Sequence, residues 1–337
     1  MAREDRANLT IRDIAKRADV SVSTVSRVLR GRETVAEELR QRVLATADEM
    51  GYSPNRAAQS LRSGRTNLVG LVIPDITTPF FAEIARSAGR TLGEAGFSVL
   101  LCDADENPDS ERRHVEVLEE RRIDGLLITP SSDKRAGCYE ETAARGIPVV
   151  LVDRLASRTL DSVRTDNIAG TFQLVTYFIS RGYDRFGVVT GRRDSLSTRE
   201  RMQGFRSACR ALNVPEDNVI LEDGMMTVGG GYEATKRLMQ RQPSPRAIFA
   251  ATSLMGVGSL RALKELGYEI PRDVALAMFD DTSLADLVDP PITVISQPID
   301  LIGQTAARML LERMKGEVLE PGREVLVQPS LIIRQST

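Results

Sequence analysis

The sequence lacks any long apolar run. No stretch approaches the roughly 18 uninterrupted apolar residues that a membrane-spanning helix needs. The opening residues, 1–8, are polar and charged instead of apolar. We therefore expect neither a signal peptide nor a membrane span, and we expect the protein to stay in the cytoplasm.

Histidine and cysteine are scarce: the chain has one histidine, His114, and three cysteines, at 102, 138 and 209. His114 lies among charges on a predicted helix, and no Ser/His/Asp, Cys/His, metal-ligand or Walker-type arrangement is found. An odd number of cysteines without metal-ligand spacing indicates reduced, mostly buried thiols. We therefore expect no enzyme, catalytic residue, metal or cofactor.

One glycine run needs an interpretation of its own. Residues 229–231, all glycine, stand where a helix opens but lack the rest of a phosphate-binding fingerprint. We interpret them as a loop.

Charge is nearly balanced over the whole chain, with a formal net charge of −2, but it is unevenly distributed. Residues 1–62 carry 12 Lys and Arg against 9 Asp and Glu, and the remainder carries 33 against 38. The overall balance by itself argues against a nucleic-acid partner, and only the positive N-terminal part favours one.

Two short helices are predicted within residues 10–29, TIRDIAKRADVSVSTVSRVL. Apolar residues recur at helical spacing in two segments with a break at residues 18–20. Thr10 and Asp13 form a predicted capping box, and Ser21 can cap the second helix. This is a helix-turn-helix pattern with residues 21–30 as the recognition helix.

A third helix is predicted over residues 35–50. Its apolar side chains on one side would close a small core: Leu39, Val43, Leu44, Ala47 and Met50. After Gly51, Ser53 and Pro54 begin a further segment at 55–62. A helix of about eight residues is too short to be stable alone in water, so we expect it to order only on DNA.

From residue 68 onward, short apolar strands alternate with amphipathic helices in two series. The first series predicts strands at 69–74, 98–103, 125–129 and 148–153, with helices from 81 and over about 111–121. The second predicts helices from 166 to 177 and from 199, with strands at 186–190, 219–222, 247–251 and 274–279. This pattern is typical of parallel sheets covered on both faces, arranged here as two lobes.

The N-terminal region also resembles a known family. The strings TIRDIAKRADVSVSTVSRVLRG and MGYSPNRAAQSLRSGRTNLVGLVIPD resemble the headpiece, hinge and first core strand of the LacI/GalR family, and the resemblance returns in blocks as far as residues 297–298. It implies an all-α helix-turn-helix headpiece (1–54), a hinge helix and linker (55–66), and a two-lobed α/β core of the type I periplasmic-binding-protein fold (67–337).

The same resemblance implies how the core is divided. The first lobe would comprise about 67–164 plus 297–326, and the second about 165–296 plus 327–337, joined by three crossovers. The last residues, 331–337, leave no room for a tetramerising heptad helix, so we expect a homodimer.

Two headpieces related by a two-fold axis would read a pseudo-palindromic operator on double-stranded DNA. The resemblance assigns base contacts to Val22, Ser23, Arg27 and, as a minor-groove wedge, Leu61. It assigns phosphate contacts to Thr10, Ser21, Thr24, Asn55 and Arg56. Asp19 stands where the family usually has glycine, and aspartate tolerates the left-handed conformation better than most residues.

A ligand site is expected where strands end. The residues Phe80, Phe81, Asp153, Arg154, Arg201, Asp280 and Gln297 are similar to the pentose-contacting set of periplasmic ribose-binding proteins, and Ser197, Met226 and Thr252 are further candidates. Aromatic faces among carboxylates and guanidiniums suit a small hydroxyl-rich ligand. Thr252-Ser253 replaces the family's usual Asn-Asp, which favours a ligand other than free ribose.

The sequence therefore predicts a ligand-responsive, sequence-specific DNA-binding regulator, a repressor of a sugar or nucleoside utilisation operon. Two alternatives stay open at this point. One is a global regulator that responds to a partner phosphoprotein, and the other is a solute-binding receptor. The sequence specifies neither the effector nor the sign of its action.

Overall fold

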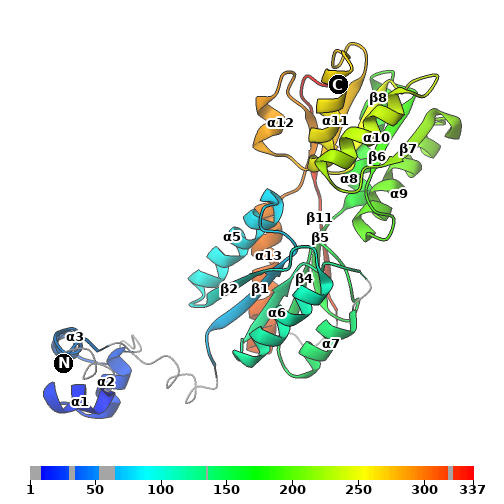
Figure 1. The fold of residues 1–337 in the computed structure, drawn as a ribbon. Coiled ribbons are helices and arrows are strands. Elements are labelled where there is room, and N and C mark those ends of the chain that lie inside the picture. The colour runs from blue at the N-terminus through cyan, green and yellow to red at the C-terminus, as the bar shows by residue number, and fades with distance from the viewer. Residues whose placement is uncertain (1–8, 30–34, 53–64, 134–135, 318–321) are drawn as a thin grey trace. The chain divides into compact units, whose positions relative to one another are not determined.

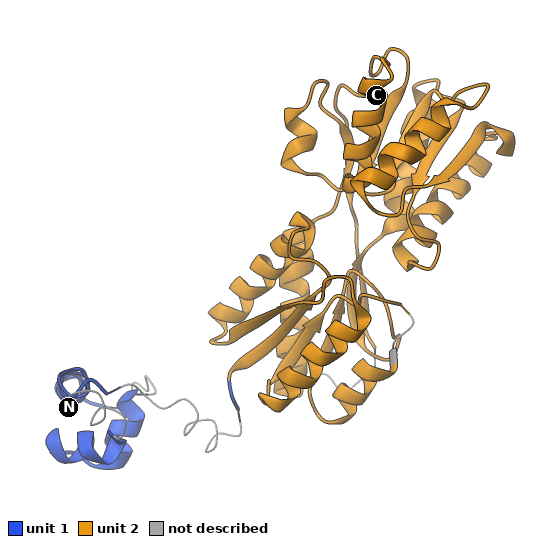
Figure 2. Cartoon of the chain, in the orientation of Figure 1, with its two compact units in different colours: residues 1–66 blue, residues 67–337 orange. Residues whose placement is uncertain are grey.

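The computed structural model describes residues 9–29, 35–52, 65–133, 136–317 and 322–337. The chain divides into two compact units, residues 1–66 and 67–337 (Figure 2). Each unit has its own hydrophobic core.

The first unit contains three helices: α1 (Ile11–Arg17), α2 (Val22–Leu29) and α3 (Glu37–Glu49). The predicted capping box is confirmed, because the Asp13 carboxylate accepts hydrogen bonds from the backbone N of Thr10 at 2.8 Å and from its hydroxyl at 2.7 Å. Ser21 Oγ accepts a hydrogen bond from the backbone N of Thr24 at 3.1 Å, so the second cap is confirmed as well. Asp19 forms the turn with φ of +50°.

The core of this unit differs from the prediction at two positions, because Leu39 is only partly buried and lies outside the core, and Leu44 is exposed. Ile14, Val25 and Val43 are fully buried between the three helices. Leu44 was expected among them but is 39 % exposed, whereas Thr46 is buried. The hydroxyl of Thr46 donates to Arg42 O at 2.8 Å, which satisfies its hydrogen bond inside the helix and lets its methyl group pack.

The second unit contains two six-stranded sheets with the same spatial order (Figure 1). The first sheet runs β11-β5-β4-β3-β1-β2 and is parallel throughout. The second runs β12-β10-β9-β8-β6-β7, and only β12 is antiparallel to its neighbour. The strands are β1 (Leu68–Ile73), β2 (Ser98–Asp103), β3 (Gly125–Ile128), β4 (Val149–Val152), β5 (Asp161–Thr165), β6 (Phe186–Thr190), β7 (Val219–Asp223), β8 (Ala247–Ala250), β9 (Ala275–Phe279), β10 (Thr293–Ser296), β11 (Glu324–Val327) and β12 (Ser330–Ile332).

Helices cover both faces of the first sheet, as the apolar strands predict. Along β1, Val69, Leu71 and Ile73 pack with α5 and α13, whereas Val72 packs with α6 and α7 on the other face. The second sheet is enclosed by the remaining helices in one continuous core. The helices are α5 (Pro79–Glu94), α6 (Pro108–Glu120), α7 (Ala136–Ala144), α8 (Asn167–Ser180), α9 (Leu196–Ala211), α10 (Val228–Met239), α11 (Ser253–Glu265), α12 (Ser283–Leu287) and α13 (Ile299–Lys315), with a 3₁₀ turn at Glu216–Asn218.

The chain passes between the two sheets at three places. It leaves the first sheet after β5, returns after β10 through α13 to β11, and ends in β12 of the second sheet. These connections are the points where the two lobes are joined in Figure 1. At the junction, Asp166 N donates to Val327 O at the end of β11 at 2.9 Å, and the hydroxyl of Thr165 at the end of β5 donates to the amide oxygen of Gln297.

The glycine run at 229–231 was expected to be a loop, and this is wrong: it forms the first turn of α10. A Cβ on Gly231 would lie 2.5 Å from the backbone O of Met255, and one on Gly258 would lie 2.1 Å from the backbone O of Val228. The glycines therefore allow α10 and α11 to approach each other at backbone distance.

We predict that Gly258→Ala lowers the free energy of unfolding by about 2 kcal/mol or more, because backbone atoms cannot move aside as side chains can. Urea unfolding measures this change. The control is Gly89→Ala in α5, where a Cβ would meet nothing within 4 Å and the higher helix propensity of alanine should stabilise the protein. Equal stability of Gly258→Ala and the native protein would contradict the packing argument.

Candidate functional site

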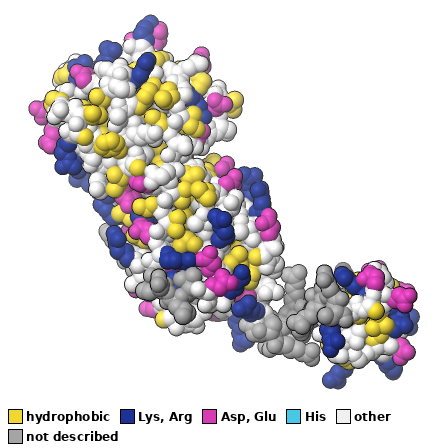
Figure 3. Space-filling view, turned by 180° about the vertical axis from the view of Figure 1, so that it is seen from behind, with side chains coloured by type: hydrophobic (Ala, Val, Ile, Leu, Met, Phe, Trp, Pro, Cys, Tyr) yellow, Lys and Arg dark blue, Asp and Glu magenta, His cyan; other side chains and the backbone are white. Residues whose placement is uncertain are grey.

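The predicted recognition helix α2 presents its polar residues outward. Val22 is 39 % exposed, and Ser23 and Arg27 are exposed on the same helix. Arg27 has no ion-pair or hydrogen-bond partner among the described residues of this unit. Figure 3 shows side chains of both charges on the face of this unit that is visible there.

Hydroxyl groups gather where α2 begins. Ser21 Oγ lies 2.7 Å from Ser23 Oγ and 2.8 Å from Thr24 Oγ1. Thr10 lies before α1, and its hydroxyl donates to Asp13, which lowers the pKa of that carboxyl. Three further predicted DNA contacts, Asn55, Arg56 and Leu61, lie outside the described residues.

In the second unit, one cavity of about 380 Å³ lies between the lobes. All ten residues that were expected to contact an effector line it: Phe80, Phe81, Asp153, Arg154, Ser197, Arg201, Met226, Thr252, Asp280 and Gln297. They come from both lobes and from the second crossover segment, between β10 and α13, so only the folded core brings them together. The cavity stands at the carboxyl ends of the strands, where open α/β sheets bind ligands.

Two aspartates occupy matching positions in the two sheets. Asp153 directly follows β4 and Asp280 directly follows β9, and both have positive φ, of 63° and 74°. This conformation is costly for most residues and less so for aspartate. It turns the chain sharply at the end of each of these two strands and leaves both carboxylates at the cavity wall.

Asp153 is 92 % buried and makes no side-chain hydrogen bond to the described residues, because only its backbone N is bonded, to Val163 O at 2.8 Å. Burial raises the pKa of Asp153 to about 6, although Arg154 and Arg201 oppose the shift. An acceptor without a donor, facing a cavity, is a position for the donor groups of a ligand.

Two of the cavity arginines, Arg154 and Arg201, are anchored by protein groups. Arg154 forms a bidentate pair with Glu106, at 2.7 and 3.0 Å, and its guanidinium lies 5.4 Å from the ring centre of Phe81. Arg201 Nε donates to Asn167 at 2.9 Å, and its guanidinium carbon lies 3.5 Å from the ring centre of Phe279. Burial lowers the pKa of Arg201. Both planar groups are held in fixed orientations.

Gln297 links the lobes and does not stand free. Its amide nitrogen donates to Asp280 at 2.5 Å, and its amide oxygen accepts from the hydroxyl of Thr165 at the end of β5. Thr252 is similarly engaged, because its hydroxyl accepts from Met255 N at 3.3 Å as the cap of α11. A ligand that used either group would share it with the protein.

Helix α9 carries further contacts between the lobes. Asp133 of the first lobe accepts a hydrogen bond from Leu196 N at 2.5 Å and lies 3.6 Å from Arg199. Arg164 Nη1 of β5 donates to both carboxylate oxygens of Glu200, at 2.9 Å each. The same helix places Ser197 and Arg201 in the cavity, so it contacts both the ligand site and the first lobe.

The sequence did not identify several cavity residues: Asp75, Thr78, Glu106, Arg192, Met225, Thr227, Ser253 and Leu254. Asp75 follows β1, so the strand-end rule that identified Asp153 also applies to it. Its carboxylate accepts hydrogen bonds from Thr77 and Thr78, which outweigh burial and lower its pKa. The sequence offers no such rule for Glu106, because only the fold places this residue against Arg154.

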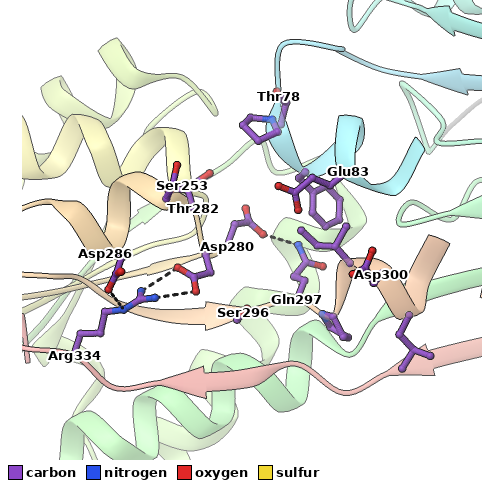
Figure 4. A pocket seen from close by; sticks show the side chains of 17 residues that line it. Thr78, Glu83, Ser253, Asp280, Thr282, Asp286, Ser296, Gln297, Asp300 and Arg334 are labelled. Atoms are coloured by element: carbon purple, nitrogen blue, oxygen red, sulfur yellow. Dashed lines mark hydrogen bonds and ion pairs between the residues drawn. The ribbon is translucent and has the colours of Figure 1, made fainter. Parts of the chain in front are cut away.

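A second, larger cavity of about 710 Å³ adjoins the first (Figure 4). The two share Thr78, Phe80, Ser253, Asp280 and Gln297, and the hydrogen bond between Asp280 and Gln297 is drawn in Figure 4. Its other labelled side chains include the acidic groups Glu83, Asp286 and Asp300, and Arg334 pairs there with Asp281 and Asp286. Its acidic lining suits the approach of cations or basic side chains, unlike the mixed lining of the first cavity.

Comparisons with known proteins agree with this arrangement. Residues 10–55 match the family model "Bacterial regulatory proteins, lacI family", and residues 175–337 match "Periplasmic binding protein-like domain". The chain is 34 % identical to the HTH-type transcriptional regulator CelR of Thermobifida fusca, over 99 % of both chains. The chain belongs to the lacI family.

Solved structures agree. The lac repressor dimer bound to operator and the anti-inducer ONPF matches with a TM-score of 0.87 at 26 % identity, over 97 % of this chain and 98 % of that chain. A LacI-family regulator from Enterococcus faecium with bound ribose matches with a TM-score of 0.73 at 29 % identity, over 80 % of this chain and 98 % of that one. This lacI-family protein is a transcriptional regulator with a helix-turn-helix unit and a core of the type I periplasmic-binding-protein fold.

No described helix is both long and apolar enough to cross a membrane. Among the described residues, no group of three or more His, Cys, Asp or Glu side chains could hold a metal ion.

We predict that Asp153→Asn stabilises this lacI-family protein at neutral pH by about 2–3 kcal/mol, because the buried carboxylate has a pKa of about 6 instead of 3.8. Asparagine tolerates the positive φ. The cost of ionising Asp153 is absent below about pH 4, grows as the pH rises and is complete above pH 6, so the advantage of the variant should follow the same course. Urea unfolding between pH 4 and pH 7.5 measures it.

Asp75→Asn is the matched control, because hydrogen bonds lower the pKa of Asp75 and its ionised form is favoured on folding. That variant should lose stability at neutral pH. A destabilised Asp153→Asn, or an effect that is the same at every pH, would refute the interpretation of Asp153.

Proposed function

We propose that this protein is a homodimeric repressor that binds a pseudo-palindromic operator through α2 and is controlled by a small hydroxyl-rich effector between the lobes. The observation that carries the effector half is the Asp153 carboxylate, which is buried at the cavity wall and has no hydrogen-bond donor among the described residues. The target is a sugar or nucleoside utilisation operon.

The chemistry of the cavity favours a neutral polyol such as a pentose or a related compound. Phe80 and Phe81 meet edge to face with ring centres 5.3 Å apart, and they offer apolar surface to the C–H face of a sugar. Carboxylates and guanidiniums lie around them as acceptors and donors for hydroxyl groups. The ribose bound by the Enterococcus faecium regulator supports this class of ligand.

The DNA half rests on the exposed residues of α2. Val22 can contact only apolar groups such as a thymine methyl, whereas Ser23 and Arg27 can bond base edges. Ser21 and Thr24, with the helix N-terminus, suit phosphate contacts, and Thr10, Asn55 and Arg56 are assigned the same role. Leu61 is assigned the minor-groove wedge between the two half-sites.

The sugar response is tested by fluorescence anisotropy of a symmetric operator-like duplex at fixed salt, with and without ribose, nucleosides, inositol and hexoses. We expect tight binding that one of these ligands changes. Arg27→Ala should weaken operator binding about tenfold or more and leave sugar affinity unchanged. Asp153→Asn should keep operator binding and lose most of the sugar response.

This experiment tests the effector half and the DNA half of the proposal separately. Binding that is tight but indifferent to every sugar would overturn the effector half alone. Equal affinity for the symmetric duplex and for a scrambled duplex would overturn the DNA half.

The homodimer is supported by apolar side chains of α12 and of the start of α13 that remain exposed in the second unit. On α12, Leu287 is 81 % exposed and Leu284 is 43 % exposed, and Leu301 at the start of α13 is 45 % exposed. Exposed apolar patches of this kind mark protein contacts. The lac repressor is a dimer in its operator complex.

We predict that Leu287→Asp weakens the dimer about tenfold or more, because it places a charge in the apolar contact. Sedimentation equilibrium measures the dissociation constant. Leu326→Asp, at a position on β11 that is 48 % exposed, is the control and should leave the dimer intact. An unchanged dimer in Leu287→Asp would exclude α12 from the interface.

A further inference from the structure

A groove of about 540 Å³ lies on the second lobe between α9 and β7. It shares no lining residue with the effector cavity. Its lining combines three features that are not used by the proposed DNA and effector sites: a row of arginines, an apolar floor and the edge of a sheet.

The row of arginines lies along one face of α9. Arg199, Arg206 and Arg210, together with Gln203, follow one another at spacings of four, three and four residues, which brings them onto a single stripe. All four are exposed. Arg206 and Arg210 have no ion-pair or hydrogen-bond partner in the described part of the chain, so their guanidiniums are available to an outside anion.

The floor of the groove is apolar. Phe205 and Cys209, from the inner side of α9, are 1 % and 6 % exposed, and Val214 and Val219 are partly buried beside them. Leu221 on β7 remains 38 % exposed at the open side. Glu216 is the single acidic residue in the lining, so the charge of the groove is positive.

The other wall is the outer edge of the second sheet. β7 is the last strand in the order and pairs with β6, and it pairs with no other strand in the described part of the chain. Edge strands are commonly protected from further pairing by charged side chains, especially lysine, or by proline. In β7, VILED, the two charged residues stand at the end of the strand, and its first three residues are apolar.

We infer that this groove binds an extended, acidic segment of a partner protein. The backbone of the segment would add to β7 as a further strand, its apolar side chains would cover Leu221 and the floor, and its carboxylates would pair with Arg206 and Arg210. A polypeptide is favoured over a nucleic acid because a strand edge offers a row of backbone groups at peptide spacing, and the groove floor offers no aromatic face for stacking bases: Phe205 is buried.

Such a segment would also reach the contact between the lobes. Arg199, at one end of the stripe, lies 3.6 Å from Asp133 of the first lobe. A carboxylate of the partner competes with Asp133 for this guanidinium. Since α9 also carries Ser197 and Arg201 in the effector cavity, the groove and the cavity lie on two sides of one helix.

The test measures binding of the full chain to a fluorescein-labelled decapeptide of alternating valine and glutamate, by anisotropy at about 50 mM salt. The matched probe replaces glutamate with lysine. We expect the acidic peptide to bind with a micromolar dissociation constant that weakens with salt, as charge pairing requires. The basic peptide should not bind. Equal binding of both peptides, or no binding of the acidic one at about 1 mM, would overturn the proposal.

The variant Arg206→Glu/Arg210→Glu should reduce affinity about tenfold or more. Arg261→Glu/Lys264→Glu on α11 makes the same change in charge on the same lobe at exposed positions and should leave affinity unchanged. An equal loss in both variants would assign the binding to net charge and overturn the groove. Retained operator binding shows that each variant folds.

A separate measurement tests whether the peptide backbone pairs with β7. A decapeptide with N-methyl groups at alternate residues keeps its carboxylates but loses the backbone donors on one edge. Of the two possible registers of methylation, one should lose affinity about tenfold and the other should retain it. Equal affinity of both would remove β7 from the site. A single-stranded oligothymidine that binds more tightly than the acidic peptide and displaces it would assign the groove to nucleic acid instead.

Discussion

The core of this protein depends on how charged groups are buried between its lobes. Taking a charge out of water is costly unless a partner of opposite charge or hydrogen-bond donors replace the water. Arg164 has Glu200 of the second lobe and Glu324 as partners, and Arg154 at the cavity wall has Glu106. Within the first lobe, Asp161 has Arg313 and Arg323. The pairs of Arg164 and Arg154 allow charged groups to be buried where the lobes meet.

Asp153 is the exception among these buried charges, because its carboxylate has no hydrogen-bond donor within the described residues. Its pKa of about 6 means that folding at neutral pH ionises it at a cost. A ligand that donates hydrogen bonds to it recovers part of that cost, and this gives binding a driving force at the contact between the lobes. The proposed coupling between effector and DNA starts from this group.

Much of the fold could be predicted from the sequence because parallel strands buried on both faces are short apolar runs, as in LVGLVI of β1. β5 escaped prediction because it reads DSVRT: its buried Asp161 and Arg164 are neutralised by arginines and glutamates more than 30 residues away in the chain. The glycines of α10 were misinterpreted as a loop because the signal for close helix packing lies in the partner helix α11 and is absent from local sequence.

Some parts of the site could be predicted from the sequence better than others. The resemblance to a family supplied residues at the strand ends, and the fold places ten of them around one cavity. It could not supply Glu106, which acts only through Arg154, nor the engagement of Gln297 with Thr165 and Asp280. Tertiary contacts decide which polar groups are satisfied by the protein and which are left for a ligand.

The most direct test of this account is the pKa of the Asp153 carboxyl, measured by ¹³C NMR titration and assigned by comparison with Asp153→Asn. The account predicts a value of about 6 in the free protein and a lower value once a bound sugar donates hydrogen bonds to the carboxylate. A pKa near the ordinary 3.8 in the free protein, or one that does not change when a sugar fills the cavity, would contradict it.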